Sequence, residues 1–271
     1  MFQWTQKWVF ALLASLLGVH NALADSAVNM PYGVTPMSHD IYNLHMTTFY
    51  ICCGIGVVVF SVLFYSLYKY RRSRGAKAAN FHEHPGVEIV WTLIPFLIVI
   101  GLAIPATIIL KDIHNTDESD LIIKITGYQW KWKYEYLDQG ISFFSNLATP
   151  QIQIDDPQKT KNEWFLLEVD NPMVIPVHKK VKILLTSNDV IHDWWLPAFG
   201  VKQDAIPGYI NENWIQVDTP GIYRGQCGEL CGAYHGFMPI VVQVVPEEEF
   251  EQWVAAHMPN KTVVSNGSKA T

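Results

Sequence analysis

Two long stretches of the chain carry no charged residue. One runs from Thr47 to Tyr68 and the other from Ile89 to Leu110. Because about 20 apolar helical residues cross the hydrocarbon core of a bilayer, the pattern predicts two membrane-spanning helices rather than two buried core helices. Pro95 and Pro105 lie inside the second stretch, and membrane helices tolerate such breaks when neighbouring groups satisfy the freed carbonyls.

From residue 121 onward the hydrophobic period changes from that of a helix to that of a strand. Residues 129–136 alternate strictly, which puts Trp130, Trp132, Tyr134 and Tyr136 on one face of a predicted strand. Short strands separated by turn residues are typical of a β-sandwich or barrel, so the fold class is an α+β membrane protein. The other predicted strands are 164–169, 181–186, 214–217, 223–226 and 240–245.

The two ends of the chain differ from its middle. Residues 1–24 have a positive start, an apolar core and a small-residue cleavage site at Ala24, which predicts a signal peptide rather than a first membrane helix. A short acidic helix is expected from Pro246 to about His257, followed by a polar, disordered tail over 259–271. The expected division is therefore an exported segment over 25–44, a helical hairpin over 45–110 and an exported β-domain over 111–258.

Charge predicts the orientation of the hairpin. Residues 69–77, between the two apolar stretches, hold five basic residues and no acidic one, which places this loop in the cytoplasm and both ends outside. Residues 111–271 hold 13 basic and 21 acidic residues, so the exported part is acidic. Glu88 opens the second stretch and is either a first-turn carboxylate favoured by the helix dipole or a proton-entry group; the residues alone favour the first reading.

The largest group of potential metal ligands lies between Cys227 and Met238, where two cysteines, a histidine and a methionine fall within twelve residues. Thiolate and imidazole suit copper, but a Cys-x3-Cys pair also allows a structural disulfide, and the ligand types allow zinc. Two bridging thiolates need an end ligand for each of two metals. His235 is one candidate, and His192 is the other. Because the loop joins two predicted strands, its ligands are held still, which favours electron transfer.

Taken together, these segments resemble subunit II of the haem–copper cytochrome c oxidases of the bacterial aa3 type. The resemblance covers about residues 40–256, and the Cys-x3-Cys-x3-His-x2-Met core carries most of its specificity. The other matching segments occur in the order of the family. They are Glu88-Ile-Val-Trp91, Gly127-Tyr-Gln-Trp130, Asp170-Asn, Asp189-Val-Ile-His192, Asp204-Ala-Ile-Pro-Gly208 and Gly225-Gln-Cys227-Gly-Glu229.

The resemblance implies a cupredoxin domain with the dinuclear copper centre CuA. In such a centre both cysteines bridge the two coppers, each histidine caps one copper, and the weak axial ligands are a thioether and a backbone carbonyl. The carboxylate of Glu229 would face a Mg²⁺ or Mn²⁺ shared with subunit I. The implied CuA ligands are His192, Cys227, Glu229 through its carbonyl, Cys231, His235 and Met238.

Further roles are implied by the same resemblance. Trp130 matches the site of electron entry from cytochrome c, and Glu88 matches the entrance of the K proton pathway into subunit I, which reverses the preference stated above. Asp170, Asp189 and Asp204 match acidic positions around the docking surface for cytochrome c. An acidic outer domain suits a basic donor, because complementary fields raise the encounter rate.

The expected protein is therefore the electron-transfer subunit of a proton-translocating cytochrome c oxidase, active only within the complex. It would pass electrons from CuA to haem a of subunit I, whose haem a3–CuB site reduces oxygen to water. Subunit III, cytochrome c and membrane lipid are the other expected partners, and no nucleic acid is expected. The expected place is the bacterial inner membrane, crossed twice, with the N-terminus and the β-domain in the periplasm. A membrane-anchored copper chaperone is the alternative.

Overall fold

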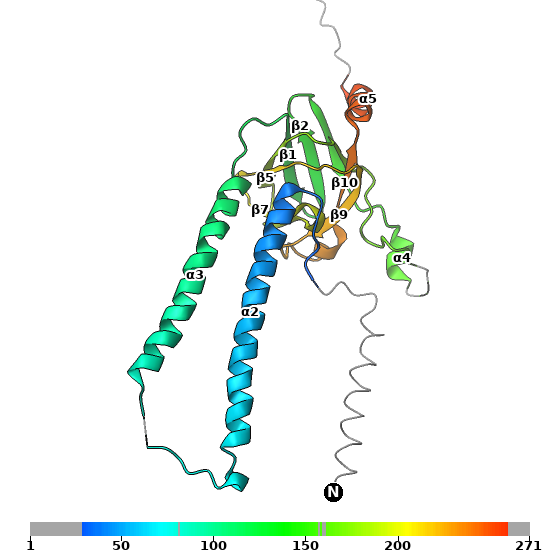
Figure 1. Cartoon of the computed structure of the whole chain (residues 1–271). Coiled ribbons are helices and arrows are strands. Elements are labelled where there is room, and N and C mark those ends of the chain that lie inside the picture. The colour runs from blue at the N-terminus through cyan, green and yellow to red at the C-terminus, as the bar shows by residue number, and fades with distance from the viewer. Residues whose placement is uncertain (1–28, 81, 157, 159–160, 260–271) are drawn as a thin grey trace, which may run out of the picture. The chain divides into compact units, whose positions relative to one another are not determined.

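The computed structural model of the chain describes residues 29–80, 82–156, 158 and 161–259 (Figure 1). The predicted signal peptide over 1–24 lies outside the described residues, and so does the predicted disordered tail apart from residue 259. All helices and strands named below belong to the compact unit that begins at Tyr32.

In the described part of the chain, two helices precede the strands. Helix α2 spans Pro36–Lys69 and helix α3 spans Pro85–Ile113, so both extend beyond the uncharged stretches of the sequence. Thr35 caps α2, because its side chain accepts from the backbone N–H of Ser38 at 3.0 Å. Both helices are long and apolar enough to cross a membrane. In each helix, no residue of the most apolar 18-residue window is buried within the chain. Their apolar surface therefore suits a lipid environment.

The described residues form ten strands in two five-stranded sheets. In the first sheet the order is β3-β2-β1-β5-β8, and in the second it is β4-β10-β9-β6-β7. The pairs β1–β5 and β4–β10 are parallel, and the other pairs are antiparallel. The first sheet comprises β1 (Leu121–Tyr128), β2 (Lys131–Tyr136), β3 (Ile141–Ser145), β5 (Val181–Ser187) and β8 (Asn211–Ile215). The second comprises β4 (Met173–Pro176), β6 (His192–Leu196), β7 (Val201–Ala205), β9 (Gly221–Cys227) and β10 (Pro239–Val245).

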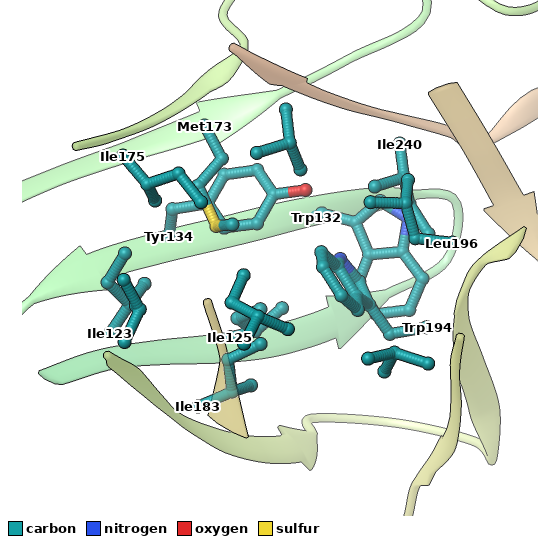
Figure 2. Packing of buried hydrophobic residues seen from close by; sticks show 14 of the residues in the cluster. Ile123, Ile125, Trp132, Tyr134, Met173, Ile175, Ile183, Trp194, Leu196 and Ile240 are labelled. Atoms are coloured by element: carbon teal, nitrogen blue, oxygen red, sulfur yellow. The ribbon is translucent and has the colours of Figure 1, made fainter. Parts of the chain in front are cut away.

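The core lies where the inward faces of the two sheets meet. Along β5, buried and half-buried positions alternate strictly, as expected for a strand with one face in a core. Trp132 from the first sheet and Trp194 from the second are both fully buried and belong to the same cluster (Figure 2). The expected architecture, two apolar helices followed by a β-sandwich, is confirmed.

Three predictions about strands were wrong in detail. Residues 129–130 are the two-residue turn of the β1–β2 hairpin, because Tyr128 pairs with Lys131, so Trp130 does not lie on the strand. Residues 164–169 form no strand; Leu166 has a φ of 63°, which breaks an extended run. The strand predicted over 214–217 is β8, which begins earlier and ends at Ile215.

Short helices complete the described part of the chain. Helix α4 spans Gln151–Asp155, and α5 spans Glu247–His257, close to the expected C-terminal helix. Helix α5 buries Phe250, and Trp253 packs on Tyr136 with ring centroids 5.1 Å apart. Three single turns of 3₁₀-helix are η1 (Arg72–Arg74), η2 (Pro197–Phe199) and η3 (His235–Phe237).

Candidate metal centre

The loop from Cys227 to Met238 is held at both ends by paired strands. Strand β9 ends at Cys227 and β10 begins at Pro239, which pairs with Gln226. Strand β6 pairs with β9 on its other edge, and its register places Trp194 opposite Cys227. His192, two residues before Trp194, therefore starts its strand beside the cysteine loop, although it is 35 residues away in the sequence.

Two free cysteines and one histidine lie close together at this point. Cys227 and Cys231 are 4% and 3% exposed, and their Sγ atoms are 3.8 Å apart. One ligand atom from each of Cys227, Cys231 and His192 lies within 4.8 Å of the others. The structure thus forms a buried sulfur and nitrogen donor set that could hold a metal ion, and it contains no disulfide between these two cysteines.

The remaining expected ligands surround this group. His235 Nδ1 is 3.7 Å from Cys231 Sγ, and Met238 Sδ is 3.5 Å from the same sulfur. The Cys227 thiol donates to the backbone carbonyl of Glu229 at 3.3 Å. All six residues that the resemblance implied for copper are therefore brought together.

The orientation of His192 is set by Asp189. His192 Nε2 is 2.8 Å from Asp189 Oδ1, and the ring is fully buried. His192 Nδ1 is buried and has no hydrogen-bond partner among the described residues. A carboxylate on one ring nitrogen with the other nitrogen free is the usual arrangement of a metal-binding histidine, so Nδ1 is the nitrogen available to a metal.

Asp189 also ties this histidine to the β1–β2 hairpin. Its Oδ2 accepts from the backbone N–H of Gln129 at 2.7 Å, and its Oδ1 accepts from that of Val190 at 2.7 Å. Partial burial acts to raise the pKa of Asp189, but the hydrogen bonds from His192, Val190 and Gln129 outweigh it, so its pKa is lowered. The carboxylate is thus engaged within the chain on both oxygens.

The surroundings of the two thiols disfavour their thiolate forms unless a cation is bound. Burial, followed by the neighbouring Cys227, raises the pKa of the Cys231 thiol to about 12. Two thiolates this close would repel each other in the absence of a cation, whereas a bound metal ion reverses that preference and deprotonates coordinating thiols. The donor set therefore fits a soft metal such as copper, which thiolate and imidazole favour.

Gly127 makes room for the His192 ring. A Cβ atom at position 127 would lie 2.8 Å from His192 Cδ2 and 3.0 Å from its Cγ. A glycine inside a strand often marks a close approach of another group, and Gly127 lies within β1. Gly127 lies in one of the segments that match the family, but its residue type alone indicates no role there.

Trp130 lies at the tip of the hairpin, against the cysteine loop. The indole Nε1 donates to the backbone carbonyl of Cys231 at 3.2 Å, and the side-chain amide of Gln129 donates to the same oxygen at 2.9 Å. Tyr234 meets the indole edge-on, with ring centroids 5.0 Å apart. Trp130 is half-buried, whereas Trp132 is fully buried in the core. Gln129 lies in a segment that matches the family, but neither its residue type nor its place in the predicted strand 129–136 indicates this contact.

The other expected site residues lie elsewhere. Both carboxylate oxygens of Asp170 accept from Asn146, at 2.7 Å from the backbone N–H and 2.8 Å from the side-chain amide. Asp204 is exposed on β7, directly opposite Asp193 of β6. Burial, and then Asp204, raises the pKa of the buried Asp193 to about 7. Glu229 is exposed, so its carboxylate is open to a further partner.

Glu88 lies in the first turn of α3. Its Oε1 accepts from the backbone N–H of His84 at 3.0 Å, and His84 Nδ1 accepts from the backbone N–H of Val87 at 3.2 Å. The carboxylate therefore caps the start of the helix, which is the structural role considered for it from the sequence. Its side chain also lines a groove on the apolar surface of α3 with Thr92 and Phe96.

Comparisons with known proteins agree on one family. The family model for the periplasmic domain of cytochrome c oxidase subunit II matches residues 121–245, and the model for its transmembrane domain matches residues 24–109. A probable cytochrome c oxidase subunit 2 of Rickettsia conorii is 37% identical over 269 residues, covering 97% of this chain and 82% of the relative. Cytochrome c oxidase subunit 2 of Cereibacter sphaeroides is 36% identical over 233 residues, covering 81% and 77%. The crystal structure of the periplasmic domain of subunit II of cytochrome oxidase from Bradyrhizobium japonicum is similar over 52% of this chain and 96% of that chain, with 46% identity and a TM-score of 0.46.

Proposed function

Because this chain belongs to the cytochrome c oxidase subunit II family, we propose that it is the electron-entry subunit of a respiratory terminal oxidase. It accepts electrons one at a time from a cytochrome c and passes them to haem a of subunit I, where oxygen is reduced to water. The observation that carries the proposal is the buried donor set of two thiols and an imidazole directly beneath Trp130.

The donor set would hold the copper centre CuA. Copper held by these thiolates and imidazoles would supply one-electron redox chemistry. Strand pairing at both ends of the loop, and the Asp189 contact to His192, hold these ligands still before any metal binds. Cys227 and Cys231 would hold the copper through their thiolates, His192 and His235 through their imidazoles, and Met238 and the Glu229 carbonyl would be weaker ligands.

Trp130 is the proposed point of electron entry. Its indole is half-buried, so one edge is available to a donor. The same indole donates a hydrogen bond to the backbone carbonyl of Cys231, and the thiolate of Cys231 is one of the proposed copper ligands. The proposed route from donor to metal therefore consists of one aromatic ring, one hydrogen bond and the covalent bonds between the Cys231 carbonyl and its Sγ.

The remaining expectations concern subunit I and the membrane. The exposed carboxylate of Glu229 would bind a Mg²⁺ or Mn²⁺ shared with subunit I, since both ions prefer oxygen ligands. Glu88 would open the K proton pathway on the cytoplasmic side. The basic segment 69–77 supports a cytoplasmic loop, which puts the β-sandwich in the periplasm of a bacterial inner membrane.

The experiment that tests the copper assignment uses the full-length chain in detergent, loaded with copper. We expect two coppers per chain and an EPR spectrum in which one electron is shared by both nuclei, with seven hyperfine lines. One copper with a four-line spectrum would overturn the assignment, and an exchangeable copper(I) with no such spectrum would favour the copper chaperone instead.

The experiment that tests electron entry uses Trp130→Gln in the assembled oxidase. We expect the copper spectrum to persist while electron transfer from cytochrome c collapses. Trp214→Gln is the matched control, because Trp214 is half-buried on β8 and its indole donates to the Asp112 carbonyl, away from the copper loop. Equal turnover in the two variants would contradict the proposed role of Trp130.

A further inference from the structure

A groove of about 520 Å³ opens beside Trp130. Two groups of residues line it, drawn from three segments of the sequence. The first is aromatic and comprises Trp130 with Tyr234 and Phe237 of the cysteine loop. The second is the α4 segment, residues 146–155, which contributes Asn146, Leu147, Thr149, Gln151, Ile154 and Asp155.

The base of the α4 segment is fastened to the sheet. Two hydrogen bonds between Asn146 and Asp170 join the chain before and after the α4 segment, and Leu147 forms a β-bridge with the adjacent Val169. The bridge comprises two backbone hydrogen bonds: the N–H of Ala148 donates to the carbonyl of Glu168 at 2.9 Å, and the N–H of Asp170 donates to that of Asn146 at 3.0 Å. We call this paired base, residues 146–148 with 168–170, the neck. The groove is therefore bordered by a fixed element at this side.

An ion pair ties the same neck to the strand that carries the cysteine loop. Arg224 of β9 donates to Glu168 Oε1 at 2.6 Å, and its guanidinium lies 4.0 Å from the ring centroid of Trp164. The side chain of Arg224 is 15% exposed and that of Glu168 is 36% exposed, so solvent screens this pair only in part. Because Arg224 is three residues before Cys227, the α4 segment is positioned from the same strand as the metal ligands.

We propose that the α4 segment is a specificity-determining part of the docking site for a basic cytochrome c, and that the groove receives a lysine or arginine side chain of that donor. The aliphatic stem of such a side chain packs against Ile154 and the aromatic residues, and its charged end reaches Asp155. This inference rests on the proposed function, since it places the donor at Trp130.

Charge supports this occupant. Residues 111–271 hold 21 acidic and 13 basic residues, so a basic partner is attracted to this part of the chain. Asp155 is exposed at the groove, and Gln151 donates to its Oδ1 at 2.9 Å, which leaves lone pairs for a cation. Asp170 and Asp189, in contrast, use both carboxylate oxygens within the chain.

Helix α4 offers matched controls for both parts of the proposal. Ile154 lines the groove, whereas Ile152 of the same helix is 63% exposed and does not line it. Asp155 lines the groove, whereas the adjacent Asp156 does not. The experiment therefore compares Ile154→Ser with Ile152→Ser, and Asp155→Asn with Asp156→Asn, in the assembled oxidase. Steady-state oxidation of a basic cytochrome c is measured over a range of salt concentrations.

We expect Ile154→Ser and Asp155→Asn each to raise KM for cytochrome c by about two- to fivefold, more than either changes kcat, with the copper spectrum unchanged. The effect of Asp155→Asn should shrink as salt rises, because it removes a charge, whereas that of Ile154→Ser should persist. The two control variants should keep the original KM.

Equal KM values in test and control variants would overturn the inference. A changed association state of the oxidase, with KM untouched, would also overturn it and assign the groove to a subunit contact. Failure here is distinguishable from failure of the proposed function: Trp130→Gln would still abolish electron entry if only the α4 proposal is wrong.

Discussion

Replacing Gly127 by alanine would drive a methyl group into the imidazole of His192. The added Cβ would lie 2.8 Å from Cδ2, closer than carbon atoms in folded proteins approach each other. The backbone at this position has little freedom to retreat, because Gly127 pairs with Trp132 on one side and Ser187 on the other. The imidazole must therefore give way, and its hydrogen bond to Asp189 is lost or bent.

Two effects of this change have separate magnitudes. Overpacking of a well-filled site costs about 1–3 kcal/mol, so the unfolding free energy of the copper-free chain should fall by about that amount. Loss of the group that orients a metal-binding histidine weakens metal binding by about 10- to 100-fold. Copper affinity should therefore fall within that range, even where the chain remains folded.

The assay is competition for copper between the full-length chain and a chelator, together with thermal unfolding of the copper-free chain. Gly236→Ala is the matched control, because Gly236 belongs to the cysteine loop and a Cβ there would meet no atom within 4 Å. If Gly127→Ala binds copper as tightly as Gly236→Ala, the ring does not depend on the space at position 127, and the reasoning is refuted.

Three further outcomes are expected. Asp189→Asn should lower copper affinity by about 10- to 100-fold in the same competition, whereas Asp138→Asn, on an exposed turn, should leave it unchanged; equal affinities would show that the charge facing His192 is dispensable. Asp170→Asn should lower the unfolding free energy by about 0.5–1.5 kcal/mol through the lost acceptor for the Asn146 side chain, with the salt dependence of cytochrome c oxidation retained; a weaker salt dependence at unchanged stability would support docking instead. Because the Cys231 thiol has a raised pKa and binds metal as a thiolate, copper affinity should rise with pH and loading should release protons; a pH-independent affinity near neutrality would argue against thiolate ligands.

The membrane helices and the sandwich were predictable because their patterns are long and periodic. Two uncharged stretches and several alternating runs leave few other folds. The prediction that Trp130 lies on a strand was wrong for a physical reason. Alternation of residues 129–136 continues through a two-residue turn, and periodicity alone cannot tell a turn from the strand that follows it. The same turn is what brings Trp130 to the tip of the hairpin.

The ligand set was predictable from spacing and resemblance, but its surroundings were not. Asp189 was expected at a docking surface, whereas its carboxylate contacts His192 and the backbone of Gln129. That role depends on how a loop after β5 meets the β1–β2 hairpin, 60 residues away in the sequence. Gly127 and Gln129 act through the same long-range packing, which residue types and local spacing do not encode.

The hydrogen bond between Trp130 and Cys231 ties the formation of the donor set to the folding of the whole sandwich. Its two ends are 101 residues apart in the sequence, and all the donor residues precede β10, the last strand that the structure describes. A chain whose two sheets are only partly assembled therefore lacks part of the donor set. In the folded chain the two cysteines are 4% and 3% exposed, so the packing that assembles the site also shields its thiols from solvent.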